Sequence, residues 1–182
     1  MLRIRPQSLA KGLNASIRPF SSSTGRQLIP VHISGQGNGT VQTITVPGKP
    51  FKFSTDAYTM MDGKESHPSP IAYSLASLSS CNQVTGSVVA KELGIEIGEW
   101  LITVEGKLPT EVFLGGEQGN PNWDSVALKV QVQSNLMGDH DPKFLHFAAE
   151  VERRCPMTAL FKRSGVRYTS EWINKPLREA SR

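Results

Sequence analysis

Residues 69–94 predict one long helix that is nearly free of charged side chains. Ser69 can cap its N-terminus, Pro70 suits the first helical position, and Gly94 ends the pattern. Apolar side chains recur between these signals at helical spacing, at Ile71, Leu75, Leu78, Val84 and Val88. Because no charge occurs from residue 71 to residue 90, we expect this helix to be buried on most sides, in a domain centre or at a subunit interface.

The other patterns predict strands on both sides of that helix and two further helices. We expect strands at 28–34, 40–46, 51–54, 100–105, 126–133 and 166–173. Glycines at 35–39 predict a flexible turn after the first strand. Asp141-Pro142 opens a helix that ends near residue 154, and Pro156 opens a short one that ends at Gly165. Since helices do not alternate regularly with strands, this order favours an α+β fold.

The positive charge of the chain is concentrated at its N-terminus. The 182 residues carry a net charge of +4, but residues 1–27 hold five basic residues and no acidic one. Without them, 15 basic and 16 acidic side chains remain, which gives a net charge of −1. The body of the protein therefore has no electrostatic basis for binding a nucleic acid. No stretch approaches the roughly 20 apolar residues that span a membrane.

Residues 1–27 have the composition of a mitochondrial transit peptide. They are rich in Arg and Ser, and their apolar residues are scattered, whereas a secretory signal needs a continuous apolar stretch. Residues 18–23 resemble the arginine-directed cleavage sites of such leaders. We therefore expect a transit peptide at 1–27, one domain at 28–182, and a location in the mitochondrial matrix. The alternative is a basic tail on a cytosolic protein.

Cys81 and Cys155 are the only cysteines, so any sulfur chemistry must use them. Cys81 lies on the apolar side of the long helix, where a free cysteine often serves as a small hydrophobic residue. Cys155 takes the N-cap position of the helix that starts at Pro156, where free amides and the helix dipole stabilise a thiolate. Arg153 and Arg154 could add positive charge there.

The sequence indicates neither a metal site nor a cofactor. It has no C-x-x-C motif, and its four histidines lack a ligand-like spacing to either cysteine. The glycine-rich segments at 35–39 and 115–116 lack the strand-to-helix setting of a phosphate-binding loop.

The two cysteines stand in specific motifs. Ser-Pro-x-x-Tyr-x-Leu-Ala-Ser-Leu-x-Ser-Cys ends at Cys81, and Arg-Cys-Pro follows at 154–156. With this pair of motifs the chain resembles the OsmC/Ohr family, the osmotically inducible and organic hydroperoxide resistance proteins, over residues 29–173. Together with the leader, the resemblance points to a eukaryotic, mitochondrial-type member.

The resemblance implies an OsmC-like fold, with two long central helices packed between β-sheets in an intertwined homodimer. It also implies a thiol peroxidase. Cys81 would be the peroxidatic cysteine that attacks an organic hydroperoxide, and Cys155 would resolve the resulting sulfenic acid to a disulfide. A dithiol, of lipoyl type, would reduce that disulfide. Local electrostatics instead favour Cys155 as the more acidic thiol.

The activating pair of the family is absent at the matching positions. Hydroperoxide-reducing members hold the thiolate with an arginine from the N-terminal strands and orient it with a glutamate near the start of the first long helix. Residues 28–81 contain no arginine, and the glutamate positions hold Ile71 or Ala72. Two alternatives therefore stay open. One is an OsmC-like protein that binds an apolar ligand in the dimer cleft without catalysis, and the other is a thiol–disulfide redox partner of other proteins.

Overall fold

The structure, a computed structural model, describes residues 27–178. The predicted transit peptide lies outside the described residues except for its last position. Every described helix and strand belongs to the compact unit that begins at Ile33. Among these helices, none has the length and apolar character needed to cross a membrane.

The N-terminal strands form an antiparallel sheet. Its strands, in spatial order, are β1 (Ser34–Asn38), β2 (Val41–Thr45) and β3 (Lys52–Thr55). The predicted strand at 28–34 and turn at 35–39 are wrong, because the glycines themselves form β1. At Gly37 the neighbouring strand is so close that an added Cβ would lie 2.4 Å from the Val41 carbonyl oxygen. These glycines therefore permit close strand pairing, and the turn follows at Gly39, where φ is 60°.

The predicted long helix is confirmed as α1 (Pro70–Leu93). The Ser69 hydroxyl accepts a hydrogen bond from the Ala72 N–H at 3.1 Å, and Gly94 closes the helix with φ of 61°. The fully buried positions of the helix are Leu78, Asn82, Gly86, Val89 and Ala90. This buried side differs from the predicted apolar stripe.

Two valines of the predicted stripe lie at the surface of the single chain. Val84 is 65% exposed and Val88 is 47% exposed. The helix packs instead through Gly86, where an added Cβ would lie 2.4 Å from the Trp100 ring. Hydropathy misplaces the stripe because Asn82 and Gly86 are buried without being strongly apolar. One apolar strip of α1 therefore stays uncovered by the described part of this chain.

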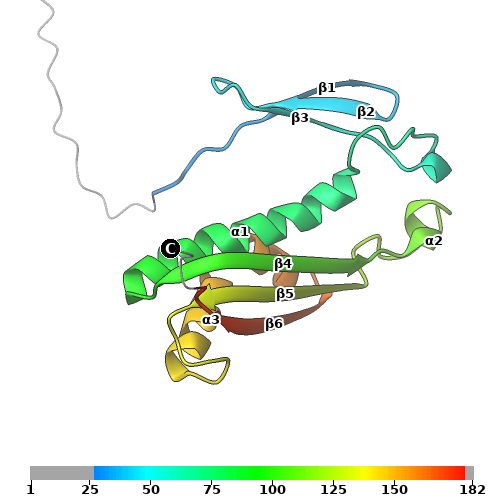
Figure 1. Ribbon diagram of the computed structural model, residues 1–182. Coiled ribbons are helices and arrows are strands. Elements are labelled where there is room, and N and C mark those ends of the chain that lie inside the picture. Colours follow the sequence, from blue (N-terminus) through cyan, green and yellow to red (C-terminus); the bar gives the residue numbers. More distant parts are fainter. Residues whose placement is uncertain (1–26, 179–182) are drawn as a thin grey trace, which may run out of the picture. The chain divides into compact units, whose positions relative to one another are not determined.

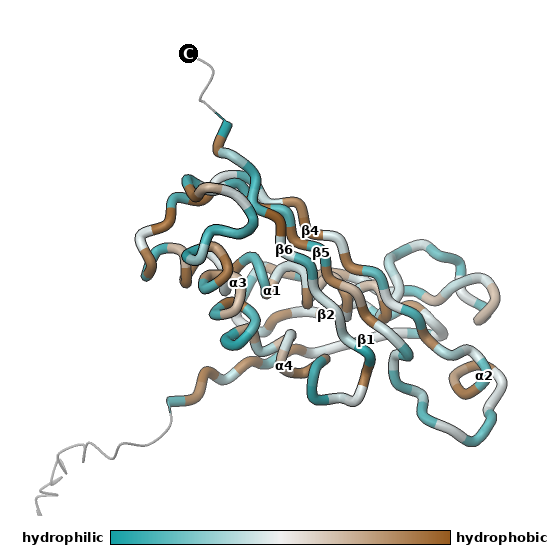
Figure 2. The backbone as a smooth tube through the Cα atoms, turned by 90° about the horizontal axis from the view of Figure 1, so that it is seen from below, coloured by the Kyte–Doolittle hydropathy of each residue, from teal (hydrophilic) through white to brown (hydrophobic). Residues whose placement is uncertain are grey.

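A second sheet carries most of the core. Its strands, in spatial order, are β4 (Ile97–Lys107), β5 (Ser125–Ser134) and β6 (Arg167–Pro176). β4 and β5 are antiparallel, whereas β5 and β6 are parallel. The buried apolar residues of β5 are Val126, Leu128, Val130 and Val132, as the alternation predicts, and Ser134 is buried on the same side. This alternation of apolar and polar residues can be followed along β4 and β5 in the tube colours of Figure 2.

Two helices pack on the apolar face of this sheet (Figure 1). α1 contributes Val89 to the core, and α3 (Pro142–Arg154) contributes Phe144 and Phe147. α4 (Pro156–Arg163) follows α3 after a single intervening residue. Apart from α2 (Thr110–Phe113) and a 3-10 turn at Thr59–Met61, the order of elements is the predicted one. The α+β class is confirmed.

Candidate functional site

The two thiols meet where α1 and α4 pack together. Cys81 lies in the middle of α1 and is half-buried, while Cys155 joins α3 to α4 and is fully buried. Both cysteines are free thiols. The predicted N-cap role of Cys155 is confirmed, because its Sγ accepts the Thr158 N–H at 3.5 Å. The first turn of α4 thus directs backbone donors at this sulfur.

The surroundings of Cys81 raise the pKa of its thiol. Burial is the main cause, and the neighbouring Cys155 thiol adds to the rise. The backbone N–H of Met157 and the Thr85 hydroxyl act in the opposite direction but do not cancel it. Two conclusions follow: the sulfurs of Cys81 and Cys155 are neighbours, and Cys81 faces the first turn of α4.

Arg153 and Arg154 do not turn toward the thiols. Arg153 donates from Nε and Nη2 to the two carboxylate oxygens of Glu150, each at 2.8 Å. Arg154 pairs with Glu92 of α1, with Nη2 at 3.0 Å from Oε1. Within residues 27–178 neither guanidinium forms a hydrogen bond with a sulfur. The structure therefore brings Cys81 and Cys155 together and leaves both arginines on carboxylates.

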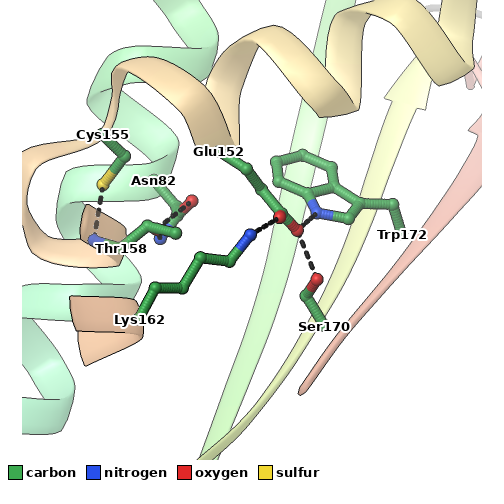
Figure 3. Close-up of polar contacts among 7 residues, drawn as sticks. All are labelled: Asn82, Glu152, Cys155, Thr158, Lys162, Ser170 and Trp172. Atoms are coloured by element: carbon green, nitrogen blue, oxygen red, sulfur yellow. Dashed lines mark hydrogen bonds and ion pairs between the residues drawn. The ribbon is translucent and has the colours of Figure 1, made fainter. Parts of the chain in front are cut away.

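Two buried polar residues behind the thiols were not singled out by the sequence patterns. Asn82 and Thr158 are both completely inaccessible to solvent. The Asn82 Nδ2 donates to the Thr158 Oγ1 at 3.1 Å and to the Leu78 carbonyl oxygen at 2.9 Å. The Thr158 hydroxyl donates in turn to the Asn82 Oδ1 at 3.3 Å (Figure 3). A signal was present, since Asn82 is a polar residue four positions after Leu78 on a charge-free helix.

A second polar network links α3, α4 and β6. The Glu152 carboxylate accepts from Lys162 Nζ at 2.6 Å, from Trp172 Nε1 at 2.9 Å and from the Ser170 hydroxyl (Figure 3). Burial alone raises the pKa of Glu152, but these three donors together hold it below its ordinary value. The network therefore fastens α4 to the sheet through a carboxylate that remains ionised.

Replacing Glu152 by Gln is expected to lower the free energy of unfolding at pH 7 by about 1–3 kcal/mol, because Lys162 loses its ionic partner. Since the folded-state pKa lies below the ordinary value of 4.5, the stabilisation is present above about pH 4.5 and is lost as the pH falls through the folded-state pKa. Urea unfolding of both proteins at pH 7 and pH 4 measures this difference. An identical pH dependence in wild type and Glu152→Gln contradicts the assignment.

The basic residues between β2 and α1 are the candidates to replace the missing family arginine. Lys49, Lys52, Lys64 and His67 are all exposed. In the part of the chain that the structure describes, none of them donates a hydrogen bond to Cys81. Glu65, the acid nearest to the start of α1, accepts instead from the backbone N–H of Thr59 at 3.0 Å. The donors that lower the pKa of Cys81 are thus Met157 and Thr85.

An apolar cavity of about 600 Å³ opens at the N-terminal end of α1. Its apolar walls include Met60, Met61, Ile71, Leu75, Phe113 and Trp123. At its rim the Ser69 hydroxyl donates to the Tyr58 hydroxyl at 3.1 Å. Asp56 fixes the loop that forms one wall, because its buried carboxylate accepts from Thr40, Ala57, Lys64 and Ser66. One wall of the cavity is therefore held in place by the hydrogen bonds of Asp56, and the lining of the cavity is mostly apolar.

Comparison with known proteins gives one family match and a set of similar folds. A family model described as OsmC-like protein matches residues 63–171. No curated protein matches the chain significantly. An OsmC-like protein from Mycoplasma pneumoniae has a TM-score of 0.65 at 20% identity, and the match covers 80% of this chain and 97% of that one.

Two further solved structures show the same likeness. An organic hydroperoxide resistance protein OsmC from Legionella pneumophila has a TM-score of 0.61 at 13% identity, with 81% of this chain and 98% of that chain covered. The organic hydroperoxide resistance protein OhrB of Bacillus subtilis has a TM-score of 0.55 at 18% identity, with 80% and 99% covered. At such low identity these likenesses establish the fold alone, and the expected OsmC-like fold is confirmed for the single chain.

Proposed function

Because this chain belongs to the OsmC-like protein family, we propose that it is a thiol-dependent organic hydroperoxide reductase. The observation that carries the proposal is the meeting of its only two thiols at the contact of α1 with α4. Two similar structures are of proteins named for organic hydroperoxide resistance, which agrees with this chemistry.

The proposed reaction uses each thiol once. The Cys81 thiolate attacks the distal oxygen of the hydroperoxide, the O–O bond breaks, and the alkoxide leaves as an alcohol after taking a proton. Cys81 is now a sulfenic acid. The Cys155 sulfur then attacks the Cys81 sulfur, an S–S bond forms, the S–O bond breaks, and water leaves. Two thiols are oxidised and one hydroperoxide is reduced in each cycle.

A dithiol completes the cycle by reducing the Cys81–Cys155 disulfide. One of its sulfurs attacks the Cys81–Cys155 disulfide, and its second sulfur completes the exchange, so that both protein thiols return and the dithiol becomes a disulfide. We propose a lipoyl-type dithiol and the mitochondrial matrix as its setting, on the basis of the family resemblance and the leader-like composition of residues 1–27. Recycling by dihydrolipoamide, and matrix import of the full chain with a fluorescent tag, test these two proposals. Failure of either one removes that proposal alone.

Thiol counting tests the proposed pairing. One equivalent of cumene hydroperoxide added to the reduced protein should remove both thiols and give one intramolecular disulfide between the peptides of Cys81 and Cys155. Peptide mapping by mass spectrometry identifies that linkage. Loss of a single thiol, or disulfides between chains only, contradicts the assignment of Cys155 as the resolving partner.

The exposed strip of α1 supports a homodimer. Val84 and Val88 lie on this strip without a cover from their own chain, in the same helix as Cys81. An uncovered apolar helix face on a chain of this size favours association. We propose that two copies pack through α1, as the family resemblance implies. Sedimentation equilibrium measures the assembly, and a monomer at micromolar concentration contradicts it.

The apolar cavity favours a second candidate function, the binding of an apolar ligand without catalysis. Its volume of about 600 Å³ falls within the range of small-molecule sites, and its walls are mostly hydrophobic. Retention of an aliphatic carboxylic acid by protein whose thiols are blocked would support this function. This candidate differs from the first because it does not need Cys81.

Ala72→Trp is expected to weaken the binding of a medium-chain fatty acid by about tenfold or more, which corresponds to about 1.4 kcal/mol. Ala72 lines the cavity yet sits at an exposed helical position, so the larger ring can fill the cavity with little effect on the core. Ala76→Trp, one turn further along α1 and also exposed, is the matched control. Calorimetric titration measures both, and equal affinities of the two variants exclude the cavity as the binding site.

A further inference from the structure

Asn82 and Thr158 form a closed pair of hydrogen bonds across the contact of α1 with α4. Each side chain both donates to and accepts from the other, at 3.1 and 3.3 Å. Both lie at zero exposure beside an apolar cluster that contains Leu78 and Phe161. Since neither side chain reaches solvent, a shift of either helix leaves a buried amide or hydroxyl without its main partner, and a further buried hydroxyl near Thr158 is that of Tyr168.

This pair is coupled to both thiols. Asn82 directly follows Cys81 in α1, and the backbone N–H of Thr158 donates to the Cys155 Sγ (Figure 3). Cys155 is the only residue between α3 and α4, since it closes the first helix and caps the second. The position of its sulfur therefore depends on where the first turn of α4 lies against α1.

An apolar contact could hold the two helices together as strongly, but it would not select one register. Hydrophobic burial is not directional, whereas the reciprocal amide–hydroxyl pair is satisfied at one distance and one rotation of α4. We propose that Asn82 and Thr158 are positioning residues that hold the Cys155 sulfur beside the Cys81 sulfur. In the resolving step this fixes the line along which the Cys155 sulfur displaces water from the Cys81 sulfenic acid. The role in that step rests on the proposed peroxidase function, but the positioning of the two sulfurs does not.

The effective concentration of the two thiols measures positioning without any hydroperoxide. It is obtained from the fraction of Cys81–Cys155 disulfide in glutathione redox buffers. Thr158→Val keeps the shape of the side chain and the backbone N–H but removes the hydroxyl, so the effective concentration should fall about tenfold or more, as expected for a small misplacement of reacting groups. Thr158→Ser retains a hydroxyl and should stay within about twofold of wild type.

Two further variants separate positioning from stability. The double variant Asn82→Leu/Thr158→Val removes both polar groups, so it should unfold closer to the wild-type temperature than Thr158→Val while keeping the low effective concentration. If Thr158→Val does not fold, the effective concentration measured in this double variant tests the positioning role instead. Ser164→Ala removes a hydroxyl that bonds the Phe161 carbonyl oxygen at the far end of α4, and it serves as the matched control.

The outcomes distinguish this proposal from the proposed function. Wild-type effective concentrations in both Thr158→Val and the double variant overturn the positioning role. If Thr158→Val shows the expected loss of effective concentration in glutathione buffers while the wild-type protein does not react with cumene hydroperoxide, the positioning role is confirmed and the proposed peroxidase function is overturned. If both hold, the rate of disulfide formation after oxidation of Cys81 should fall in Thr158→Val by about the same factor as the effective concentration, while the rate of sulfenic acid formation changes little.

Discussion

Cys81→Ser is expected to lower the rate constant for organic hydroperoxide reduction by about 10³-fold or more, to the background of the buffer. A serine hydroxyl does not ionise at neutral pH and cannot pass through a sulfenic acid, so the first bond-forming step is lost. The remaining Cys155 cannot substitute, because its sulfur is fully buried. Turnover with cumene hydroperoxide and dihydrolipoamide measures the effect.

The neighbouring residue offers a close control for this substitution. Ser80→Ala changes an exposed hydroxyl whose only hydrogen bond within the described residues is to the Ser77 carbonyl oxygen, at 3.4 Å. It should leave turnover near the wild-type rate. Activity in Cys81→Ser that approaches that of Ser80→Ala would show that Cys81 is not the peroxidatic residue. If fatty acid binding persists unchanged in Cys81→Ser while wild type shows no turnover, the second candidate function is favoured.

Cys155→Ser is expected to consume one equivalent of hydroperoxide and then to stop. Cys81 forms its sulfenic acid as before, but no second thiol lies beside it to form the disulfide. With excess hydroperoxide the sulfenic acid should proceed to the sulfinic acid, which a dithiol does not reduce. Mass spectrometry of the intact protein follows the addition of one and then of a second oxygen atom.

The alternative result for Cys155→Ser is equally clear. Normal turnover with dihydrolipoamide would mean that an external thiol attacks the Cys81 sulfenic acid directly, and the resolving role of Cys155 would be wrong. Cys81 is half-buried, so under the proposed mechanism we expect a bulky reductant to reach its sulfenic acid slowly. A small monothiol should therefore rescue the variant better than a large one.

Elements with local signals could be predicted from the sequence. Ser69-Pro70 and Asp141-Pro142 mark the starts of α1 and α3, and each cap forms the expected hydrogen bond within its own first turn. The alternation of apolar and polar residues along β4 and β5 also predicts which side chains are buried, because successive side chains of a strand point to opposite faces of the sheet. These features depend on neighbours within a few residues.

Features that depend on distant partners could not be predicted in the same way. Gly37 is predicted in a turn because the strand that pairs with it is not evident from the sequence. Arg154 is predicted to lie near the Cys155 sulfur because its ion pair with Glu92 of α1 is not evident either. Asn82 looks like an interruption of an apolar stripe until Thr158 is placed against it. The pairing of Cys81 with Cys155 rested on a family resemblance for the same reason, because no local signal in either helix reports the other.

The measurement that tests the central claim most directly is a stopped-flow comparison of cumene hydroperoxide with hydrogen peroxide on the reduced full-length protein, with free thiols counted afterwards. We expect both thiols to disappear together, faster than free cysteine reacts, with a marked preference for the organic hydroperoxide. The raised pKa of Cys81 makes this a demanding test, because the thiolate fraction at neutral pH is small. Oxidation no faster than that of free cysteine, or without preference between the two peroxides, would contradict the account.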